Sequence, residues 1–287
     1  MKGALVTLFI IAALLGAGSF AFVFFQKEPL VVEEPVAEQE IKTETIGRSV
    51  QGRAISAVTY GNGSRHLLFV GGIHGGYEWN SVLLANQFMD YLAANLHAVP
   101  ENITVTVIPS LNPDGVYKVV GKEGRFSATD VSPSSVTQAS GRFNANNIDL
   151  NRNFDCKWQP QSTWRSEVVG AGSAPFSEPE ARALRDFVLT HRPSAVVFWH
   201  SQANAVYASE CEAGVLPQTL MVMNTYATAA NYPAVASFDA YPVTGDAEGW
   251  LASINIPAIT VELSTHQQIE WERNLAGIKS LLTLYAR

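Results

Sequence analysis

The sequence predicts an α/β fold, in which a β-sheet is sandwiched between helices. Two observations lead to this prediction. Apolar runs of strand length alternate along the chain with longer amphipathic segments of helix length. In addition, 47% of the 287 residues are hydrophobic and only 16% are charged, which is too apolar for a disordered protein and sufficient for a large buried core.

The individual elements follow from apolar patterning and from helix start and stop signals. Buried strands are expected at four apolar runs: 66–73, 103–110, 194–199 and 256–263. Helices are expected at four amphipathic segments: 79–95, 178–191, 218–230 and 267–285. Ser177 and Glu180 have the spacing of a capping box at the start of the second helix, and Pro193 ends it. Residues 112–115 (NPDG) predict a tight turn that supports the fold.

The first 25 residues predict a membrane segment. Residues 3–25 are uncharged and apolar, and as a helix they would reach about 35 Å, enough to cross a hydrocarbon core of about 30 Å. The candidate cleavage site of a secretory signal, 19–21, is followed by four more apolar residues. The sequence therefore favours one transmembrane signal-anchor helix at 1–25, with a cleaved signal peptide as the alternative.

The segment that follows predicts a tether between the membrane and a folded domain. Residues 26–42 are rich in Glu and Pro and lack periodicity, as expected of an extended acidic linker. Lys2 precedes the apolar segment and Lys27 follows it among glutamates, which favours an amino terminus inside the cell. Residues 43–287 are then expected to form one extracytoplasmic domain of a single-pass membrane protein, or a secreted domain if the signal is cleaved.

Charge and cysteine content limit the kinds of partner and site. The net charge of −7 provides no basic surface for nucleic acid, so DNA and RNA are not expected partners. The chain is separately expected to be a monomer. Cys156 and Cys211 lack the Cys-x-x-Cys spacing of a structural zinc site, so any metal must be bound by His and carboxylates. In an exported domain these cysteines can form a disulfide that contributes about 4 kcal/mol, the alternative being two free thiols.

Three polar side chains directly follow apolar strands: His74, His200 and Glu262. In open α/β sheets, functional sites gather at the carboxyl ends of strands. His74 and Glu78 would face the same point if their segment were helical, because residues four apart share a helix face. Two imidazoles and one carboxylate form a known catalytic zinc set. We therefore expect His74, Glu78 and His200 to bind one Zn²⁺, with Glu262 moving the proton.

These residues lie in motifs that resemble the zinc metallocarboxypeptidases of the carboxypeptidase A/B-like, or funnelin, family, and in particular its bacterial members. The resemblance extends from Ile46 to the carboxyl terminus. It rests on seven segments in order: IGRSVQGRAI, GGIHGGYEWN, IPSLNPDG, GRFNANNIDLNRNFD, FSEPEARAL, VVFWHSQANAVY and IPAITVEL. It implies a single domain with a mixed, mostly parallel central sheet flanked by helices, and hydrolysis of an amide bond next to a free carboxylate.

The resemblance also implies roles for further residues. Glu262 matches the general base, and Arg142 matches the arginine that stabilises the oxyanion of the reaction. Asn151 and Arg152 match the pair that binds the terminal carboxylate of the substrate, for which arginine offers a bidentate fork. Tyr241 matches the mobile tyrosine that caps the substrate.

The first zinc motif departs from the family's usual His-x-x-Glu, because three residues separate His74 from Glu78. A strict count would place Tyr77 at the ligand position. Since glycines at 75–76 can absorb the added residue, and the Glu-Trp pair of the family is kept, Glu78 remains the predicted ligand. The alternative is a lost zinc site and a silent module that only binds peptides.

Substrate choice is the least determined property. Asp246 and Glu248 lie between the capping tyrosine and the general base, and they predict a preference for basic or diamino side chains, unless they are merely solvated. The leading prediction is a metallocarboxypeptidase acting on peptides; the alternative is an amidase that cuts γ-glutamyl to diamino-acid bonds in muropeptides. Of the remaining histidines, His266 is a candidate for lining the pocket, and three are expected to be structural or solvated: His66, His97 and His191.

Overall fold

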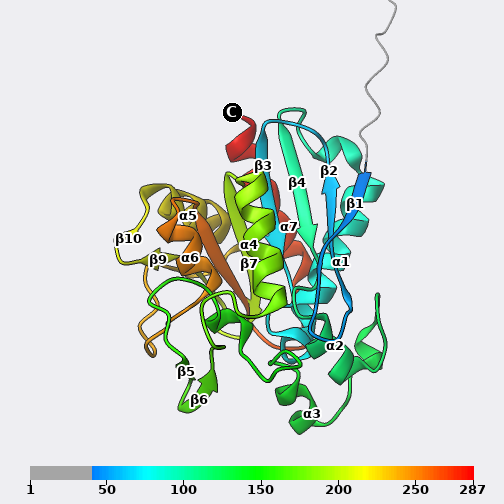
Figure 1. Ribbon diagram of the computed structural model, residues 1–287. Coiled ribbons are helices and arrows are strands. Elements are labelled where there is room, and N and C mark those ends of the chain that lie inside the picture. Colours follow the sequence, from blue (N-terminus) through cyan, green and yellow to red (C-terminus); the bar gives the residue numbers. More distant parts are fainter. Residues whose placement is uncertain (1–40) are drawn as a thin grey trace, which may run out of the picture. The chain divides into compact units, whose positions relative to one another are not determined.

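A mixed eight-stranded β-sheet runs through the part of the chain that the computed structural model describes, residues 41–287 (Figure 1). Its strand order is β1-β2-β4-β3-β7-β12-β8-β11. Four neighbouring pairs are parallel and three are antiparallel, so the predicted mixed, mostly parallel sheet is confirmed. The strands are β1 (Ile41–Arg48), β2 (Ala54–Tyr60), β3 (Arg65–Val70), β4 (Ile103–Ile108), β7 (Ala195–Ser201), β8 (Ala205–Ala208), β11 (Ala234–Val235) and β12 (Ala258–Leu263).

Helices cover both faces of this sheet and bury it. The helices are α1 (Trp79–Ala94), α2 (Pro113–Val120), α3 (Ser135–Ser140), α4 (Pro179–His191), α5 (Pro217–Ala230), α6 (Ala247–Ser253) and α7 (Trp271–Ala286). One core packs α1, α5 and α7 against the sheet, and a second packs α4 and α6 against the opposite face. Such burial on both faces explains why the central strands read as continuous apolar runs.

The alternation of side chains along the central strands directs polar residues to one face. In β7, Val197 and Trp199 belong to the first core, whereas Val196 and Phe198 belong to the second. Because residues two apart share a face, His200 points to the same side as Val196 and Phe198, toward α6. Thr260 and Glu262 of β12 follow the same rule from Ala258. The strand period therefore places functional side chains beside α6.

Two smaller antiparallel pairs lie outside the main sheet. The first is the β5–β6 hairpin, formed by β5 (Gln161–Trp164) and β6 (Glu167–Gly170), which Figure 1 shows below the main sheet. The second pairs β9 (Glu210–Cys211) with β10 (Gly214–Val215). A disulfide joins Cys156 to Cys211, with the two Cα atoms 6.0 Å apart, so the predicted bridge is present.

The predicted strands and helices are confirmed within a few residues, but β1 and β2 were not expected. Their patterns mix exposed and buried residues, because β1 is an edge strand, and they lack a continuous apolar run. Residues 41–42, assigned to the tether, are the first two residues of β1. The predicted membrane helix at 1–25 lies outside the described residues. Within 41–287, no helix combines the length and hydropathy needed to span a bilayer.

Two local predictions were wrong. Residues 112–115 do not form an isolated turn but begin α2: Asn112 caps the helix by accepting a hydrogen bond from the Gly115 amide (2.9 Å). The capping box at α4 is also absent, because Glu178 is the N-cap residue. Glu180 instead accepts hydrogen bonds from the amides of Val50 (3.1 Å) and the Asn144 side chain (3.2 Å), and so ties the loop before the site to α4.

Candidate metal centre and active site

His74, Glu78 and His200 converge in the interior as a ready metal site. The Nδ1 atoms of the two histidines are 3.1 Å apart, and the Glu78 oxygens lie 2.9 and 3.0 Å from them. All three residues are buried, and Oε2 of Glu78 has no hydrogen-bond partner. Two imidazole nitrogens and a carboxylate brought this close fit a four-coordinate zinc ion with one position left open. The set fits one zinc per chain.

The shifted spacing of the first zinc motif is absorbed by glycine. A short 3₁₀-helix, η1 (Gly75–Glu78), follows His74, and Gly75 has φ of 48°, in the left-handed region. A Cβ at Gly75 would lie 2.5 Å from the Gly141 carbonyl oxygen, so only glycine fits there. The ring of Tyr77 packs on Trp164 instead of facing the metal ligands. Glu78 is the ligand, as predicted, although the segment is not α-helical.

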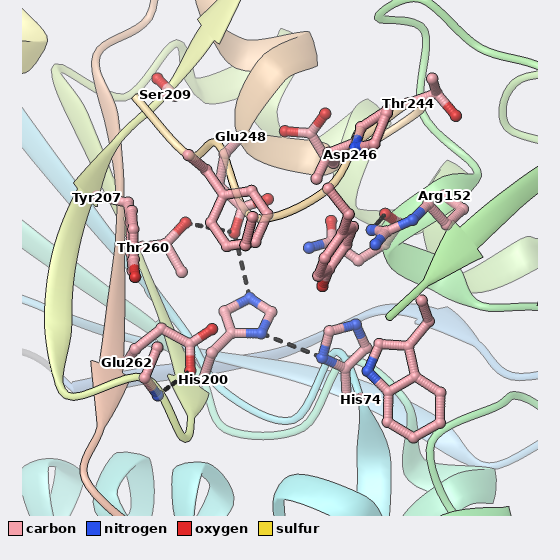
Figure 2. Close-up of a pocket in the computed structure, with 18 of the residues that line it drawn as sticks. His74, Arg152, His200, Tyr207, Ser209, Thr244, Asp246, Glu248, Thr260 and Glu262 are labelled. Carbon is pink, nitrogen blue, oxygen red and sulfur yellow. Dashed lines mark hydrogen bonds and ion pairs between the residues drawn. The ribbon is translucent and has the colours of Figure 1, made fainter. Parts of the chain in front are cut away.

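A carboxylate lies next to Nε2 of each zinc-binding histidine, on the side of the ring away from the other metal ligands. Oδ1 of Asp149 lies 3.3 Å from Nε2 of His74. Oε1 of Glu248 lies 3.1 Å from Nε2 of His200, as Figure 2 shows. Thr260 donates a hydrogen bond to the same Glu248 oxygen (3.0 Å). Carboxylates in this position orient imidazole ligands and make them more basic. Glu248 was predicted to contact the substrate side chain, but in the structure it supports His200. The equivalent support of His74 by Asp149 was not predicted.

Arg142 is held rigidly beside the metal ligands. Its Nε and Nη2 donate to Oδ2 of Asp149 at 3.0 and 2.8 Å, while Nη1 lies 3.7 Å from Oε1 of Glu78. Its Cζ lies 4.4 Å from the centroid of the Trp164 ring. Burial acts to raise the pKa of Asp149, but the charge of Arg142, together with His74 and Arg152, outweighs it and holds that pKa well below its usual range. A fixed cation therefore faces the metal ligands.

Glu262 approaches the metal ligands from β12. It pairs in register with His200 across the parallel β7–β12 ladder, and its Oε2 accepts a hydrogen bond from the Ala203 amide (3.2 Å). Burial raises the pKa of Glu262 to about 7, and the nearby Glu78 carboxylate adds to this shift. A carboxyl group that titrates near neutrality is able to take and return a proton.

Asn151 and Arg152 lie on η4 (Leu150–Arg152), on another wall of the site. Arg152 donates to the Thr163 carbonyl through Nε (3.2 Å) and Nη2 (3.1 Å) and to the Asn151 carbonyl through Nη1 (2.6 Å). Oδ1 of Asn151 accepts a hydrogen bond from the Ala247 amide (2.8 Å). These bonds use one N–H of each guanidinium nitrogen, and the second N–H groups of Nη1 and Nη2 are left to bind an anion.

Asp246 and Tyr241 come from the segment before α6. Asp246 caps α6 through the Gly249 amide (2.6 Å), and burial together with the Glu248 carboxylate raises the pKa of Asp246 to about 6. The Tyr241 ring packs edge-on against Phe238, with centroids 4.9 Å apart. Figure 2 shows Asp246 beside Arg152, with Glu262 across the cavity from them.

A cavity of about 640 Å³ joins these groups. All eight residues predicted for the site line it: His74, Glu78, Arg142, Asn151, Arg152, His200, Tyr241 and Glu262. Trp164, Arg165 and Lys157 also line it and were not predicted. His266 does not belong to this lining; its Nδ1 pairs with Ser201 Oγ (2.7 Å), beside the cavity.

The remaining histidines are structural or peripheral, as predicted. His66 pairs with Thr106 through Nε2 (2.8 Å) and packs against the rings of Phe187 and His191. Burial lowers the pKa of His66 to about 4, so this side chain is neutral in the folded protein. His97 lies in a short 3₁₀-helix away from the cavity.

Comparison with known families decides the affiliation of the chain. The model of the peptidase M14 family, described as zinc carboxypeptidase, matches residues 37–276. The chain belongs to this family. With its buried His-Glu-His site, this zinc carboxypeptidase family member is a zinc metallopeptidase.

Curated relatives in this family act on two kinds of substrate by name. The chain is 25% identical over 240 residues to γ-D-glutamyl-L-diamino acid endopeptidase 1 of Lysinibacillus sphaericus, matching 77% of this chain and 60% of the relative. It is 28% identical over 167 residues to murein peptide amidase A of Escherichia coli K12, matching 55% of this chain and 60% of the relative. It is also 25% identical over 255 residues to carboxypeptidase B of Astacus astacus, matching 85% and 78%. The matches thus span about 60% of the length of the two bacterial relatives.

Solved structures share the fold. The murein-tripeptide amidase of Escherichia coli O157 superposes with a TM-score of 0.58 at 22% identity, covering 88% of this chain and 94% of that chain. Bovine thrombin-activatable fibrinolysis inhibitor superposes with a TM-score of 0.66 at 18% identity, covering 86% and 88%. The α/β carboxypeptidase fold is therefore common to enzymes of very different names.

Proposed function

We propose that this zinc peptidase hydrolyses the amide bond between a γ-D-glutamyl residue and a diamino acid in cell-wall peptides. Two bacterial relatives support this choice over a general carboxypeptidase: one is named for γ-D-glutamyl-L-diamino acid bonds and the other for murein peptides. The observation that carries it is that Arg152 and Asp246 both line the cavity, close enough for the Arg152 charge to act on the Asp246 carboxylate (Figure 2).

That pair of opposite charges suits a diamino acid as the leaving group. A diamino acid released from its amino side carries a free carboxylate and a second, protonated amine. Arg152 offers N–H donors for the carboxylate, with Asn151 beside it. Asp246, which is largely ionised at pH 7 because its pKa is about 6, offers a negative charge for the ammonium.

The other residues at the cavity supply the chemistry. A zinc ion bound by His74, Glu78 and His200 would supply an activated water and polarise the scissile carbonyl. Glu262 accepts the proton of that water and returns it to the leaving amine. Nη1 of Arg142, which lies 3.7 Å from Oε1 of Glu78 and makes no hydrogen bond to Asp149, offers N–H donors to the negative charge that develops on the carbonyl oxygen.

Substrate closure is assigned to Tyr241. Its ring lines the cavity and rests on Phe238, in the segment that leads to Asp246. A tyrosine ring in this position covers the bound leaving group and excludes water from it.

A second candidate function is removal of basic residues from ordinary peptides. The likeness to carboxypeptidase B and the acidic Asp246 favour it. Both candidates use the same leaving-group end of the cavity, so they differ only in the acyl side of the scissile bond.

Turnover of matched substrates by the zinc-loaded full-length protein separates the two candidates. The substrates are L-Ala-γ-D-Glu-diaminopimelate and plain peptides that end in Lys or Phe. We expect kcat/KM for the γ-linked tripeptide to exceed that for the Lys peptide, and Glu262→Gln to lose all products alike. Faster cleavage of the Lys peptide would establish the carboxypeptidase instead.

We also infer that the domain works outside the cytoplasm. The Cys156–Cys211 bridge supports this location, because disulfides persist in oxidising compartments. Externally added protease should digest the domain in cells whose outer layers are permeabilised while the cytoplasmic membrane stays intact. Full protection under those conditions would contradict the location.

A further inference from the structure

The β5–β6 hairpin presents an exposed arginine, Arg165, at the catalytic cavity. We propose that Arg165 binds the free α-carboxylate of the γ-glutamyl residue on the acyl side of the scissile bond. It would then be a specificity-determining residue that distinguishes γ-glutamyl substrates from ordinary peptides. This inference rests on the proposed function and names the group that recognises the acyl half of the substrate.

The path of β5 places Arg165 on the acyl side. Thr163 accepts hydrogen bonds from Arg152, at the leaving-group end of the cavity. The ring of the next residue, Trp164, lies 4.4 Å from Cζ of Arg142, beside the metal ligands. Arg165 follows one residue further along. The strand therefore passes from the leaving-group end, across the position of the scissile bond, toward the acyl side.

The guanidinium of Arg165 is available to a ligand. Within residues 41–287 it forms no ion pair with a carboxylate, whereas Arg142 is paired with Asp149 through both Nε and Nη2. Cζ of Arg165 lies 5.4 Å from the Trp164 ring centroid. The charge of Arg165 counteracts the burial that raises the pKa of Tyr77. Tyr77 packs on Trp164 with centroids 5.1 Å apart. An unpaired cation thus lies over an aromatic surface next to the reaction centre.

The backbone of the hairpin fixes where this side chain starts. Trp164 and Glu167 form the last pair of the hairpin, so that Arg165 and Ser166 alone make the turn. Arg165 has φ of 56°, in the left-handed region that favours glycine or asparagine. The turn conformation does not require an arginine at this position, and the side chain of Arg165 lines the cavity.

The chemistry of the γ-linkage supplies the ligand. In a γ-glutamyl amide the side-chain carboxyl forms the bond, so the α-carboxylate on the acyl side stays free and negative. Amidation of this carboxylate, as in isoglutamine, removes the charge and keeps the shape. Arginine recognises a carboxylate with two parallel hydrogen bonds, which an amide cannot accept in the same way.

The test uses steady-state kinetics of the full-length, zinc-loaded protein. The two substrates are the γ-D-glutamyl tripeptide and its isoglutamine counterpart. The variants are Arg165→Gln, Arg165→Lys and, as a matched control, Arg192→Gln. Arg192 is also exposed and also has a left-handed φ, of 46°, but it lies at the end of α4 and outside the cavity lining.

We expect Arg165→Gln to raise KM for the free-acid tripeptide about tenfold, the loss of one charge-assisted contact, with kcat within about twofold. KM for the isoglutamine peptide should not change, Arg165→Lys should recover part of the loss, and Arg192→Gln should match wild type. Equal effects of Arg165→Gln on both substrates, or no effect on either, would overturn the role of Arg165 and leave the proposed function standing. Failure of the wild type to cleave either tripeptide would overturn the proposed function, and the inference with it.

Discussion

The floor and the rim of the cavity differ in how their charges are balanced. The floor consists of five residues that line the cavity and one carboxylate behind His74: His74, Glu78, Arg142, His200 and Glu248, together with Asp149. None of them is more than 5% exposed, and each lies against a buried charged or imidazole partner within the group. The rim consists of Lys157, Trp164, Arg165 and Tyr241, which are partly or fully exposed.

This difference separates reaction type from substrate choice. The floor is arranged before any substrate arrives, because charges buried in a low-dielectric interior require fixed partners. On the rim, the cations Lys157 and Arg165 form no ion pair within residues 41–287, so both side chains are available to bind a substrate. Changes in the floor should therefore alter the rate of chemistry or metal binding, and changes on the rim should alter KM.

The largest effect is expected at Glu262, which faces the floor from β12. Glu262→Gln keeps the size of the side chain and removes its ability to accept a proton, so kcat should fall about a thousandfold. Zinc content, measured by mass spectrometry of the purified protein, should stay at that of wild type. A variant that retains more than a tenth of wild-type kcat would contradict the assigned base.

The next effect is expected at Glu248, which acts through His200. Glu248→Ala should weaken zinc affinity by about ten- to a hundredfold, since the imidazole loses the acceptor that orients it. Glu248→Gln should lose less, because its amide oxygen still accepts the hydrogen bond. Zinc affinity is measured by competition with a chromogenic chelator.

Glu210→Gln provides the matched control for Glu248. Glu210 also lines the cavity, but its carboxylate accepts a hydrogen bond from Ser237 Oγ (2.7 Å) and it does not contact the metal ligands. The zinc affinity of the Glu210→Gln variant should equal that of wild type. A similar loss in both variants would mean that acidic charge in general, and not the support of His200, holds the metal.

A smaller effect is expected from the titration of Asp246. Its pKa of about 6 means that the carboxylate is ionised above pH 6 and neutral below it. The preference for a substrate with a second ammonium over its uncharged analogue should therefore fall by about tenfold on going from pH 7 to pH 5. The ratio of the two kcat/KM values at each pH cancels pH effects on the metal site. In Asp246→Asn the ratio should be low and independent of pH; a retained pH dependence would assign it to another group.

The smallest effect is expected at Tyr241 on the rim. Tyr241→Phe keeps the ring that packs on Phe238 and removes only the hydroxyl, so KM should rise about threefold, in the range of one neutral hydrogen bond. The change in kcat should be smaller than this. A loss of kcat as large as that of Glu262→Gln would place Tyr241 in the chemistry and break the separation of floor from rim.

Sequence patterning predicts the central sheet and the metal ligands well for one physical reason. Buried parallel strands are continuous apolar runs, and a polar residue that ends such a run, such as His200 or Glu262, is conspicuous. The edge strand β1 and its neighbour β2 were missed because their residues mix exposed and buried positions, which resembles a loop.

The supporting residues of the site could not be predicted in the same way. Asp149 and Glu248 act only through contacts with histidines far away in the chain, and a single carboxylate in a loop or short helix carries no periodic signal. A pattern did exist for Asp149, since it lies in the IDLNRN segment next to Asn151 and Arg152. The β5–β6 hairpin gave less signal still, because its strands have four residues each and its turn lacks glycine.

The most direct test is a zinc titration of the metal-free full-length protein, with release of the diamino acid from the γ-D-glutamyl tripeptide as the readout. The rate should rise linearly up to one zinc per chain and then stay constant, and Glu78→Ala should gain no activity at the same zinc concentration. Cleavage that is independent of zinc, or a Glu78→Ala variant that reaches the wild-type rate at one equivalent, would contradict the catalytic role of the buried floor.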